Sequence, residues 1–554
     1  MQTTHRIPLI FGIAALLISG SLVNHGLMNS PLPAGPGLTL DESFNIDQGV
    51  YLARALAQHG PLLLAPSVAQ EVFQSEKVLP DHPPLGRLLL GVAHESTAWL
   101  IPGSENTLYN VVAARLGSCF ALALMVAVLT SFVQRRYDRA TAIATGLMLL
   151  GLPPLIGHAR LAALETATNL AWVAAIVPLL SWWTGSRPPG ALRVFVSGLL
   201  WGLLLLTKVQ GILLPPAVVI WSLLRFRHRA IWPLLFWGLC GCAVFMIGWP
   251  WTWSDPVDRV LQYLGRTTER STLYCWYSGQ RFEDRLVPWH YPTVMLLLSL
   301  PAWTVVGLGL RLWRRGFDAA EQLMLLTIAM PLCVFSVPGV PVYDGTRLFL
   351  VCFPGIAFLA ARGISPLLSA LNLSASVGAR TTRAAANAQE QPRTTPRRQE
   401  SGFGIFGNWR SILIVLCLGI LPLPWTLQPF AMNQYGLLAG GNRGAAWLGM
   451  EAGYWSDALN GDFWKTVPEG ATVYVAPVCH QFQLPDIEML VPVVQQRGIR
   501  LIAWDYDPSQ RGLLLLIHRL ADLRPNLRED PTGSERISEV QMGGVTLVRL
   551  IRTD

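Results

Sequence analysis

Apolar runs of about 20 residues recur along this chain, and they constrain its fold more than any other feature. The runs lie at residues 7–24, 109–131, 140–157, 161–183, 194–206, 211–224, 231–250, 292–312, 321–337, 348–368 and 411–427. One membrane-spanning helix needs about 20 mostly apolar residues. With 52% hydrophobic and 14% charged residues and a mean hydropathy of +0.39, the 554 residues carry more apolar surface than a soluble domain buries. The chain is therefore predicted to be an α-helical polytopic membrane protein with about 11 transmembrane helices. The runs 194–206 and 211–224 are short and could instead form one broken or re-entrant element.

Clusters of arginine give the expected orientation, because cytoplasmic loops are enriched in basic residues. The clusters are Arg135, Arg136 and Arg139; Arg225, Arg227 and Arg229; and Arg311, Arg314 and Arg315. They fall on alternate loops only if the N-terminus is cytoplasmic. An uncleaved first helix keeps the later loops on these sides of the membrane, which favours it over a signal peptide. It also accounts for the net charge of +8 without any nucleic-acid partner.

Composition divides the chain into four regions. Residues 1–368 form the transmembrane module, which includes a first outer loop at 25–108, and residues 369–410 form a basic linker predicted to be disordered and cytoplasmic. A last transmembrane helix at 411–427 precedes an extracytoplasmic domain at 428–554. The domain is expected to be a small α/β fold, because it has short β-branched runs and, around 511–522, helical spacing.

Two adjacent carboxylates, Asp41 and Glu42, open a polar segment in the first outer loop. The apolar positions that follow predict an amphipathic helix along the membrane surface, with both carboxylates at its start. Acidic residues at a helix start are also common caps with no catalytic role, and the residues alone favour that interpretation. The motif DHPPLGR at 81–87 follows, in which His82 and Arg87 are potential anion ligands or parts of a rigid loop.

Further ionisable or polar residues stand near the outer ends of spans, where they usually face a polar cavity or a partner. Arg160, Glu165 and Asn169 occur in GHARLAALETATNLAW, and Glu165 and Asn169 share one helix face. Lys208 interrupts two apolar runs in LLLLTKVQG, and it either binds a phosphate or snorkels to the interface.

Two aromatic segments complete the candidates. Tyr343 and Arg347 lie at the entrance of a span, where Arg347 either binds phosphate or pairs with Asp344. Trp289, His290 and Tyr291 either line a groove for a sugar or an isoprenoid chain or simply anchor the protein at the interface. Eight cysteines give neither a disulfide framework nor metal-ligand spacing, so no metal and no cofactor is expected.

Together the Asp-Glu pair, DHPPLGR, ARLAALE and LLTKVQG resemble glycosyltransferase family 39, which includes protein O-mannosyltransferases and, more distantly, the lipid A aminoarabinose transferase. The resemblance covers roughly residues 1–365. It implies a GT-C fold in which a cavity on the outer face takes a sugar from a polyprenyl-phosphate donor and transfers it with inversion. The acceptor would be a hydroxyl of a lipid, glycan or protein. Such a protein is expected in a bacterial inner membrane, among membrane lipids, with the active site and C-terminal domain outside.

The resemblance also implies roles for individual residues. Asp41 matches the family's first acidic residue and would be the catalytic base, with Glu42 orienting the acceptor or supporting the base. Lys208 and Arg347 would bind the donor phosphate, with His82, Arg87 and Arg160 as further candidates. Glu165, Asn169, Trp289, His290, Tyr291 and Tyr343 would line the cavity or contact the acceptor. Glu165 stands where mannosyltransferases usually carry Asp, which weakens its assignment.

Two alternatives remain open at the level of sequence. A transporter or flippase for a lipid-linked sugar would share the span count and the charged cavity, although such proteins usually show repeat symmetry. The second alternative is a catalytically inactive relative that binds an envelope lipid through its outer domain.

Overall fold

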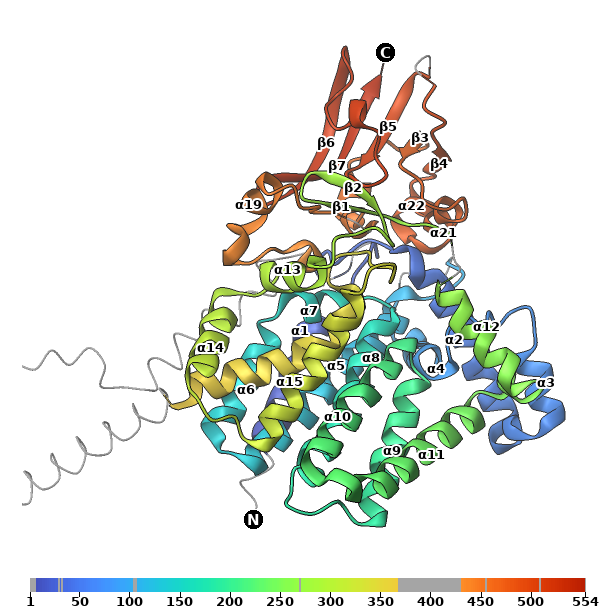
Figure 1. Cartoon of the computed structure of the whole chain (residues 1–554). Coiled ribbons are helices and arrows are strands. Elements are labelled where there is room, and N and C mark those ends of the chain that lie inside the picture. The colour runs from blue at the N-terminus through green and yellow to red at the C-terminus, as the bar shows by residue number, and fades with distance from the viewer. Residues whose placement is uncertain are drawn as a thin grey trace, which may run out of the picture.

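The computed structural model describes residues 6–27, 30, 33–102, 107–268, 271–366, 430–453, 456–507 and 510–553. These residues form a large helical module with a small sheet-containing domain on one end, and the N-terminus lies at the end of the module away from that domain (Figure 1). The predicted fold class, a helical polytopic protein with a C-terminal α/β domain, is therefore confirmed. The expected linker at 369–410 and the expected last transmembrane helix at 411–427 lie outside the described residues.

Helices account for most of the module, and a two-stranded hairpin lies between α12 and α13. The helices are α1 (Arg6–Gly20), α2 (Leu40–His59), α3 (Pro66–Phe73), α4 (Pro84–Thr97), α5 (Val111–Arg136), α6 (Arg139–Leu150), α7 (Pro153–Ala159), α8 (Leu164–Trp182), α9 (Ala191–Leu205), α10 (Leu214–Phe226), α11 (Ile231–Gly248), α12 (Pro256–Thr268), α13 (Tyr291–Leu298), α14 (Ala302–Trp313) and α15 (Ala319–Phe335). The hairpin strands are β1 (Tyr274–Tyr277) and β2 (Gln280–Glu283).

The expected spans correspond to apolar helices, although several are short or bent. Among the described residues, four helical stretches are long and apolar enough to cross a membrane: Val111–Arg136, Leu164–Trp182, Val209–Gly248 and Arg347–Pro366. Two bent pairs, α6 with α7 at 63° and α13 with α14 at 116°, raise the number to six if each pair is one span. Helices α1, α9 and α15 are apolar but shorter. The predicted run 211–224 falls within the 40-residue stretch Val209–Gly248, and the run 231–250 ends two residues beyond it.

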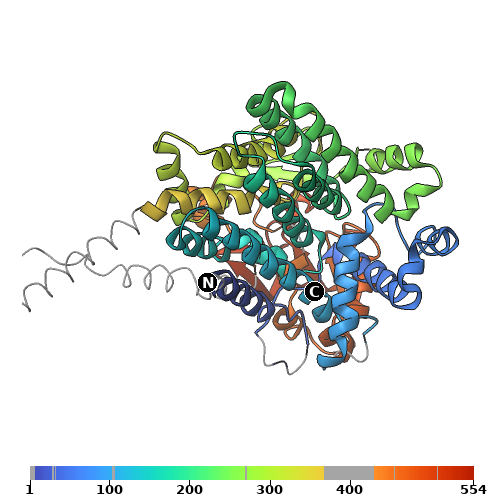
Figure 2. The same ribbon diagram turned by 90° about the horizontal axis from the view of Figure 1, so that it is seen from below.

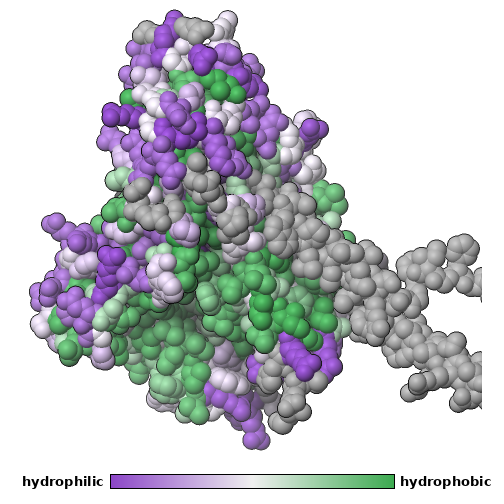
Figure 3. All heavy atoms as spheres, turned by 180° about the vertical axis from the view of Figure 1, so that it is seen from behind, coloured by the Kyte–Doolittle hydropathy of each residue, from purple (hydrophilic) through white to green (hydrophobic). Residues whose placement is uncertain are grey.

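Surface hydropathy separates the two parts of the molecule. Apolar side chains cover much of the helical module, whereas the C-terminal domain is largely hydrophilic (Figure 3). Seen from the end opposite the sheet, the helices cover most of that domain (Figure 2). This division is expected of a protein whose helices face lipid while its attached domain faces water.

The C-terminal domain is built on a five-stranded mixed sheet in the order β4-β3-β5-β7-β6. Its elements are α19 (Gly441–Trp447), α20 (Gly461–Trp464), β3 (Thr472–Ala476), α21 (Gln483–Leu490), α22 (Pro492–Gln496), β4 (Arg500–Ala503), β5 (Gly512–Ile517), β6 (Ser534–Met542) and β7 (Val545–Thr553). Strand β3 is parallel to β4 and β5, whereas β7 is antiparallel to both β5 and β6.

The helix expected around 511–522 is wrong, because Gly512–Ile517 is the central strand β5. Five successive residues of this strand, Leu513 to Ile517, are buried. A strand covered on both faces has a continuous apolar run, which periodicity alone does not distinguish from a buried helix.

Three hydrogen bonds join the C-terminal domain to the segment before α2. Gly37 N–H donates to Asp457 O at 2.7 Å, Ser456 Oγ donates to Leu38 O at 2.6 Å, and Val493 N–H donates to Gly26 O at 3.1 Å. Because Leu38 lies just before α2, these bonds hold the start of that helix against the domain. The segment before α2 and the domain therefore cover the same end of the helical module.

Candidate functional site

Helix α2 begins with a capping box that uses Glu42. Thr39 is the N-cap, and its N–H and Oγ1 both donate to Glu42 Oε2, at 2.9 and 3.0 Å. Glu42 is 0% exposed and also accepts two bonds of 2.7 Å from the Arg115 guanidinium and one of 2.7 Å from Ala162 N–H. Burial alone would raise the pKa of Glu42, but the Arg115 charge and these hydrogen bonds outweigh it and lower that pKa. Glu42 is thus an ionised anchor that holds together α2, α5 and the loop before α8.

Asp41 has a different environment, although it is the next residue along the helix. Its side chain is 35% exposed and forms an ion pair with the Arg347 guanidinium. It also lines the largest cavity described below. Of the two adjacent carboxylates, only Asp41 is accessible to a substrate.

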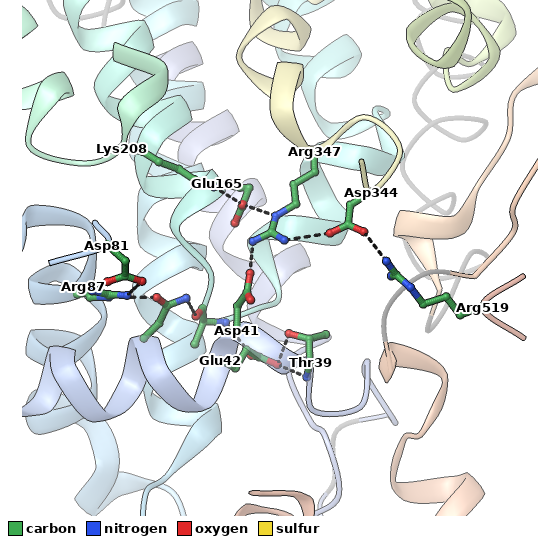
Figure 4. Close-up of polar contacts among 12 residues, drawn as sticks. Thr39, Asp41, Glu42, Asp81, Arg87, Glu165, Lys208, Asp344, Arg347 and Arg519 are labelled. Atoms are coloured by element: carbon green, nitrogen blue, oxygen red, sulfur yellow. Dashed lines mark hydrogen bonds and ion pairs between the residues drawn. The ribbon is translucent and has the colours of Figure 1, made fainter. Parts of the chain in front are cut away.

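Arg347 lies at the centre of an ionic network that contains two of the five predicted phosphate ligands, Arg347 itself and Lys208. Its Nε donates to Glu165 Oε1 at 2.7 Å, and its Nη1 donates to Asp344 Oδ2 at 3.1 Å. Lys208 Nζ donates to the same Glu165 oxygen at 2.7 Å. Glu165 therefore holds the two cations side by side, next to Asp41 (Figure 4).

The DHPPLGR segment contributes one side chain enclosed by hydrogen bonds, Arg87, and one largely buried side chain at the cavity wall, His82. Arg87 is buried and donates to both oxygens of Asp81, at 2.8 and 2.9 Å, and to Gln48 Oε1 at 2.8 Å. His82 lines the cavity, and its Nδ1 has no hydrogen-bond partner among the described residues. Burial lowers the pKa of His82 to about 3 despite the nearby Asp81 carboxylate, so the imidazole is neutral at physiological pH.

A cavity of about 940 Å³ lies between the helical module and the C-terminal domain. Asp41, His82, Tyr343 and Arg347 line it on the side of the module. A smaller pocket of about 60 Å³ adjoins it and is lined by Asp41, Phe44, Asn45, Asp81, His82, Arg87, Leu164, Lys208 and Arg347. Asp41, the neutral His82 and Arg347 line both spaces, whereas Lys208 lines the smaller pocket only. The Asp41 carboxylate and the two cations therefore face the smaller pocket, which opens on the large cavity at Asp41 and Arg347.

The other predicted residues lie further from this region. Arg160 is buried next to Asp457 of the C-terminal domain, and Asn169 is buried on α8, one turn after Glu165. Neither residue lines the cavity.

The three predicted aromatic residues at the start of α13, Trp289, His290 and Tyr291, have different environments. Trp289 is 67% exposed, His290 Nδ1 bonds the Tyr277 hydroxyl at 2.8 Å, and the buried Tyr291 hydroxyl accepts from Gly345 N–H at 3.1 Å. Tyr291 supports the turn that carries Asp344, whereas Trp289 is placed as an interfacial anchor would be.

Several residues that shape the site were not identified from the sequence. Arg115 stands inside the apolar run 109–131, and an ionisable residue at such a position signals a buried partner. Arg519 of the C-terminal domain donates to Asp344 Oδ1 at 3.2 Å (Figure 4), and nothing in its local sequence indicates this contact. Within the described residues, no group of three or more His, Cys, Asp or Glu side chains is placed to hold a metal ion.

Comparison with known proteins gives distant structural likenesses. No protein-family model and no curated protein matches the chain. The chain is similar to the crystal structure of ArnT from Cupriavidus metallidurans bound to undecaprenyl phosphate, with 15% identity and a TM-score of 0.46. It is also similar to the apo crystal structure of that protein, with 16% identity and a TM-score of 0.47. Each likeness covers 98% of this chain and 97% of the other. At this distance the likenesses assign no functional residue, so any role of the site rests on the side chains of this chain.

Proposed function

We propose that this protein is an integral-membrane glycosyltransferase of the GT-C type that moves a sugar from a polyprenyl-phosphate donor to a hydroxyl acceptor. The observation that carries the proposal is the placement of one accessible carboxylate, Asp41, with the Lys208 and Arg347 cations around a small pocket that adjoins a large cavity. A base and a site for a leaving phosphate are the two elements that such a transfer needs.

In the proposed reaction, Asp41 takes the proton of the acceptor hydroxyl while that oxygen attacks the anomeric carbon. The bond between the anomeric carbon and the phosphate oxygen breaks, and both of its electrons leave with the lipid phosphate. Lys208 and Arg347 stabilise the charge on that phosphate, and no proton donor is required. Attack opposite the leaving group inverts the anomeric centre.

The ionic network suggests how the donor would prepare the base. In the structure, Arg347 is shared among three carboxylates, those of Asp41, Glu165 and Asp344. A donor phosphate would bind Arg347 in competition with Asp41 and release that carboxylate toward the acceptor. Glu165 and Asp344 would keep Arg347 in place during the exchange.

The proposal is tested by transfer of radiolabelled sugar from polyprenyl-phosphate donors to membrane extracts. We expect wild-type protein to transfer label and Asp41→Asn to lose transfer. Asp47→Asn is the matched control, because Asp47 lies on the same helix, is exposed and does not line the cavity. Equal transfer by Asp41→Asn and wild type would contradict the assigned base, whereas donor translocation without transfer would identify a flippase instead.

We also propose that the site faces the extracytoplasmic side. An Asp462→Cys variant places a thiol on an exposed position of the C-terminal domain. A membrane-impermeant thiol reagent should label this variant in intact cells, in a background without the natural cysteines. Labelling only after cell lysis would contradict the proposal and place the C-terminal domain in the cytoplasm.

A further inference from the structure

The C-terminal domain supplies one whole wall of the large cavity. Residues 477–481, Gln483, Ala503, Trp504, Tyr506, Arg519 and Asp522 line that wall and face the Asp41 side. Arg519 links the wall to the ionic network, because it bonds Asp344, which in turn bonds Arg347. A donor held by Lys208 and Arg347 would occupy the module side, so the opposite wall is available to the acceptor.

Two aromatic residues, Trp504 and Tyr506, continue this wall into a second space. Both line the large cavity, and both also line a cavity of about 530 Å³ on the C-terminal domain, beside β5 and residues 524–534. The two spaces thus meet at one pair of rings, whose centroids are 5.0 Å apart with planes inclined at 37°. We name this second space the outer groove.

The outer groove has the chemistry of a saccharide site. Besides the two rings, its polar and aromatic lining includes Tyr474, Gln510, Arg511, Arg524, Asn526, Glu529 and Asp530. Leu513, Leu514 and Leu527 also line it. The rings can pack against the C–H faces of a sugar, while amide, carboxylate and guanidinium groups bond its hydroxyls. Aliphatic side chains are few, as expected of a site for a polar ligand rather than a lipid tail.

Charge favours a neutral or weakly charged glycan over a polyanion. Arg524 lies with its guanidinium carbon 3.8 Å from the centre of the Tyr506 ring, and Arg511 is the other basic residue of the groove. Glu529 and Asp530 balance them, although Asp530 is already paired with Arg536 and Arg549, both at 2.5 Å. The lining itself has two basic and two acidic residues, so its formal charges cancel.

We propose that the acceptor is a glycan-bearing molecule whose sugar chain binds along Trp504 and Tyr506 in the outer groove, with its reacting hydroxyl at Asp41. This inference rests on the proposed function, because it assigns the acceptor side of the same reaction. The domain lies on the hydrophilic end of the molecule (Figure 3), so a glycan head group reaches the groove from water while any lipid part stays in the membrane.

Binding to an array of bacterial envelope oligosaccharides tests the inference with the full-length protein in nanodiscs. Wild-type protein should bind a subset of the glycans, and Trp504→Ala and Tyr506→Ala should each bind roughly three- to tenfold more weakly, which is the effect of one aromatic contact. Tyr506→Phe should retain most of the binding because it keeps the ring. Trp447→Ala is the matched control, since Trp447 is an exposed tryptophan of the same domain that lines neither space.

Binding and transfer separate this inference from the proposed function. Asp41→Asn should bind the same glycans as wild type, because binding needs no base. The acceptor assignment would be overturned if the wild type bound no glycan. It would also be overturned if wild type, Trp504→Ala and Tyr506→Ala bound glycans equally well. Neither result would affect the transfer assay, which tests the proposed function separately. Where transfer is measurable, Trp504→Ala should raise the KM for the glycan acceptor and leave the donor KM unchanged. A change in the donor KM alone would also contradict the inference.

Discussion

Asp41 and Glu42 are neighbours in the chain, yet the regions they face differ in almost every physical respect. Glu42 and Arg115 form a fully enclosed pair in which each has further hydrogen bonds to backbone groups of nearby segments. Asp41 and Arg347 form a pair at the wall of a cavity, with the carboxylate one-third exposed. A carboxylate paired with a guanidinium can therefore either stabilise the fold or be available to a substrate. Which of the two it does depends on whether the pair borders a cavity.

Helix geometry explains how adjacent residues reach such different surroundings. Successive residues of an α-helix project about 100° apart, given 3.6 residues per turn. Glu42 occupies the third position of the first turn, from which it reaches back to the N-cap Thr39, while Asp41 points toward α8 and Arg347. We call Glu42 and Arg115 the enclosed pair, and Asp41 and Arg347 the open pair.

The largest effect is expected at the open pair. Asp41→Asn removes the proposed base and should lower kcat by about 10²- to 10⁴-fold, the usual contribution of general base catalysis. Thermal stability should stay near that of the wild type, because the side chain is partly solvated. Single-turnover transfer and a thermal shift measured on one preparation check both statements. A large loss of stability in this variant would mean that Asp41 is also an anchor.

The enclosed pair should respond in the opposite way. Glu42→Gln leaves Arg115 buried without a charged partner and should destabilise the protein by about 3–5 kcal/mol. The activity per folded molecule should change little, since Glu42 does not line the cavity. Denaturation in detergent, with transfer normalised to folded protein, measures the two effects. A stable but inactive Glu42→Gln variant would give Glu42 a direct role in the reaction.

The next largest loss of activity is expected when Lys208, the second cation near Asp41, is removed. Lys208→Gln takes away one donor to the leaving phosphate and should lower kcat about 10²-fold, the scale of one lost oxyanion contact. Arg54→Gln is the matched control, because Arg54 forms an exposed ion pair with Glu95 away from the cavity. If both variants transferred sugar equally well, the phosphate would have to bind elsewhere.

The contact from the C-terminal domain should have a smaller effect. Arg519→Gln breaks the bond to Asp344, so Arg347 loses part of its support, and transfer should fall roughly three- to tenfold, as typical of residues that act through another. Arg519→Lys should restore part of the loss. Arg552→Gln is an exposed control in the same domain, because Arg552 pairs with Glu535 and lines neither space. Donor KM and kcat, measured for both variants, distinguish positioning from a general loss of folding.

The smallest effect concerns pH. Because the folded-state pKa of Glu42 is lowered below its ordinary value of 4.5, its contribution to stability is complete above that value and is lost as pH falls through the folded pKa. The melting temperature of the wild type should therefore decline on acidification below about pH 4.5 more steeply than that of Glu42→Gln. Parallel pH profiles for the two proteins would show that Glu42 is not ionised when buried.

Apolar periodicity and charge distribution allowed much of the architecture to be predicted. The helical module, the C-terminal α/β domain and the helix that follows Asp41 were all expected and are present. The expected helix at 511–522 failed, because a central strand and a buried helix have the same apolar run. The bends between α6 and α7 and between α13 and α14 were also missed, although Pro153 and Pro301 mark both positions.

The sequence by itself determined that this chain enters a membrane and which ionisable residues stand near the ends of its apolar runs, because both follow from local composition. Only the tertiary structure decided which of those residues share a space. Asp41, Glu165, Lys208 and Arg347 come from four separate segments, and Arg519 joins them through Asp344 from a distant domain. Contacts between segments so far apart depend on how helices and domain pack together, and no local pattern in the chain records that packing.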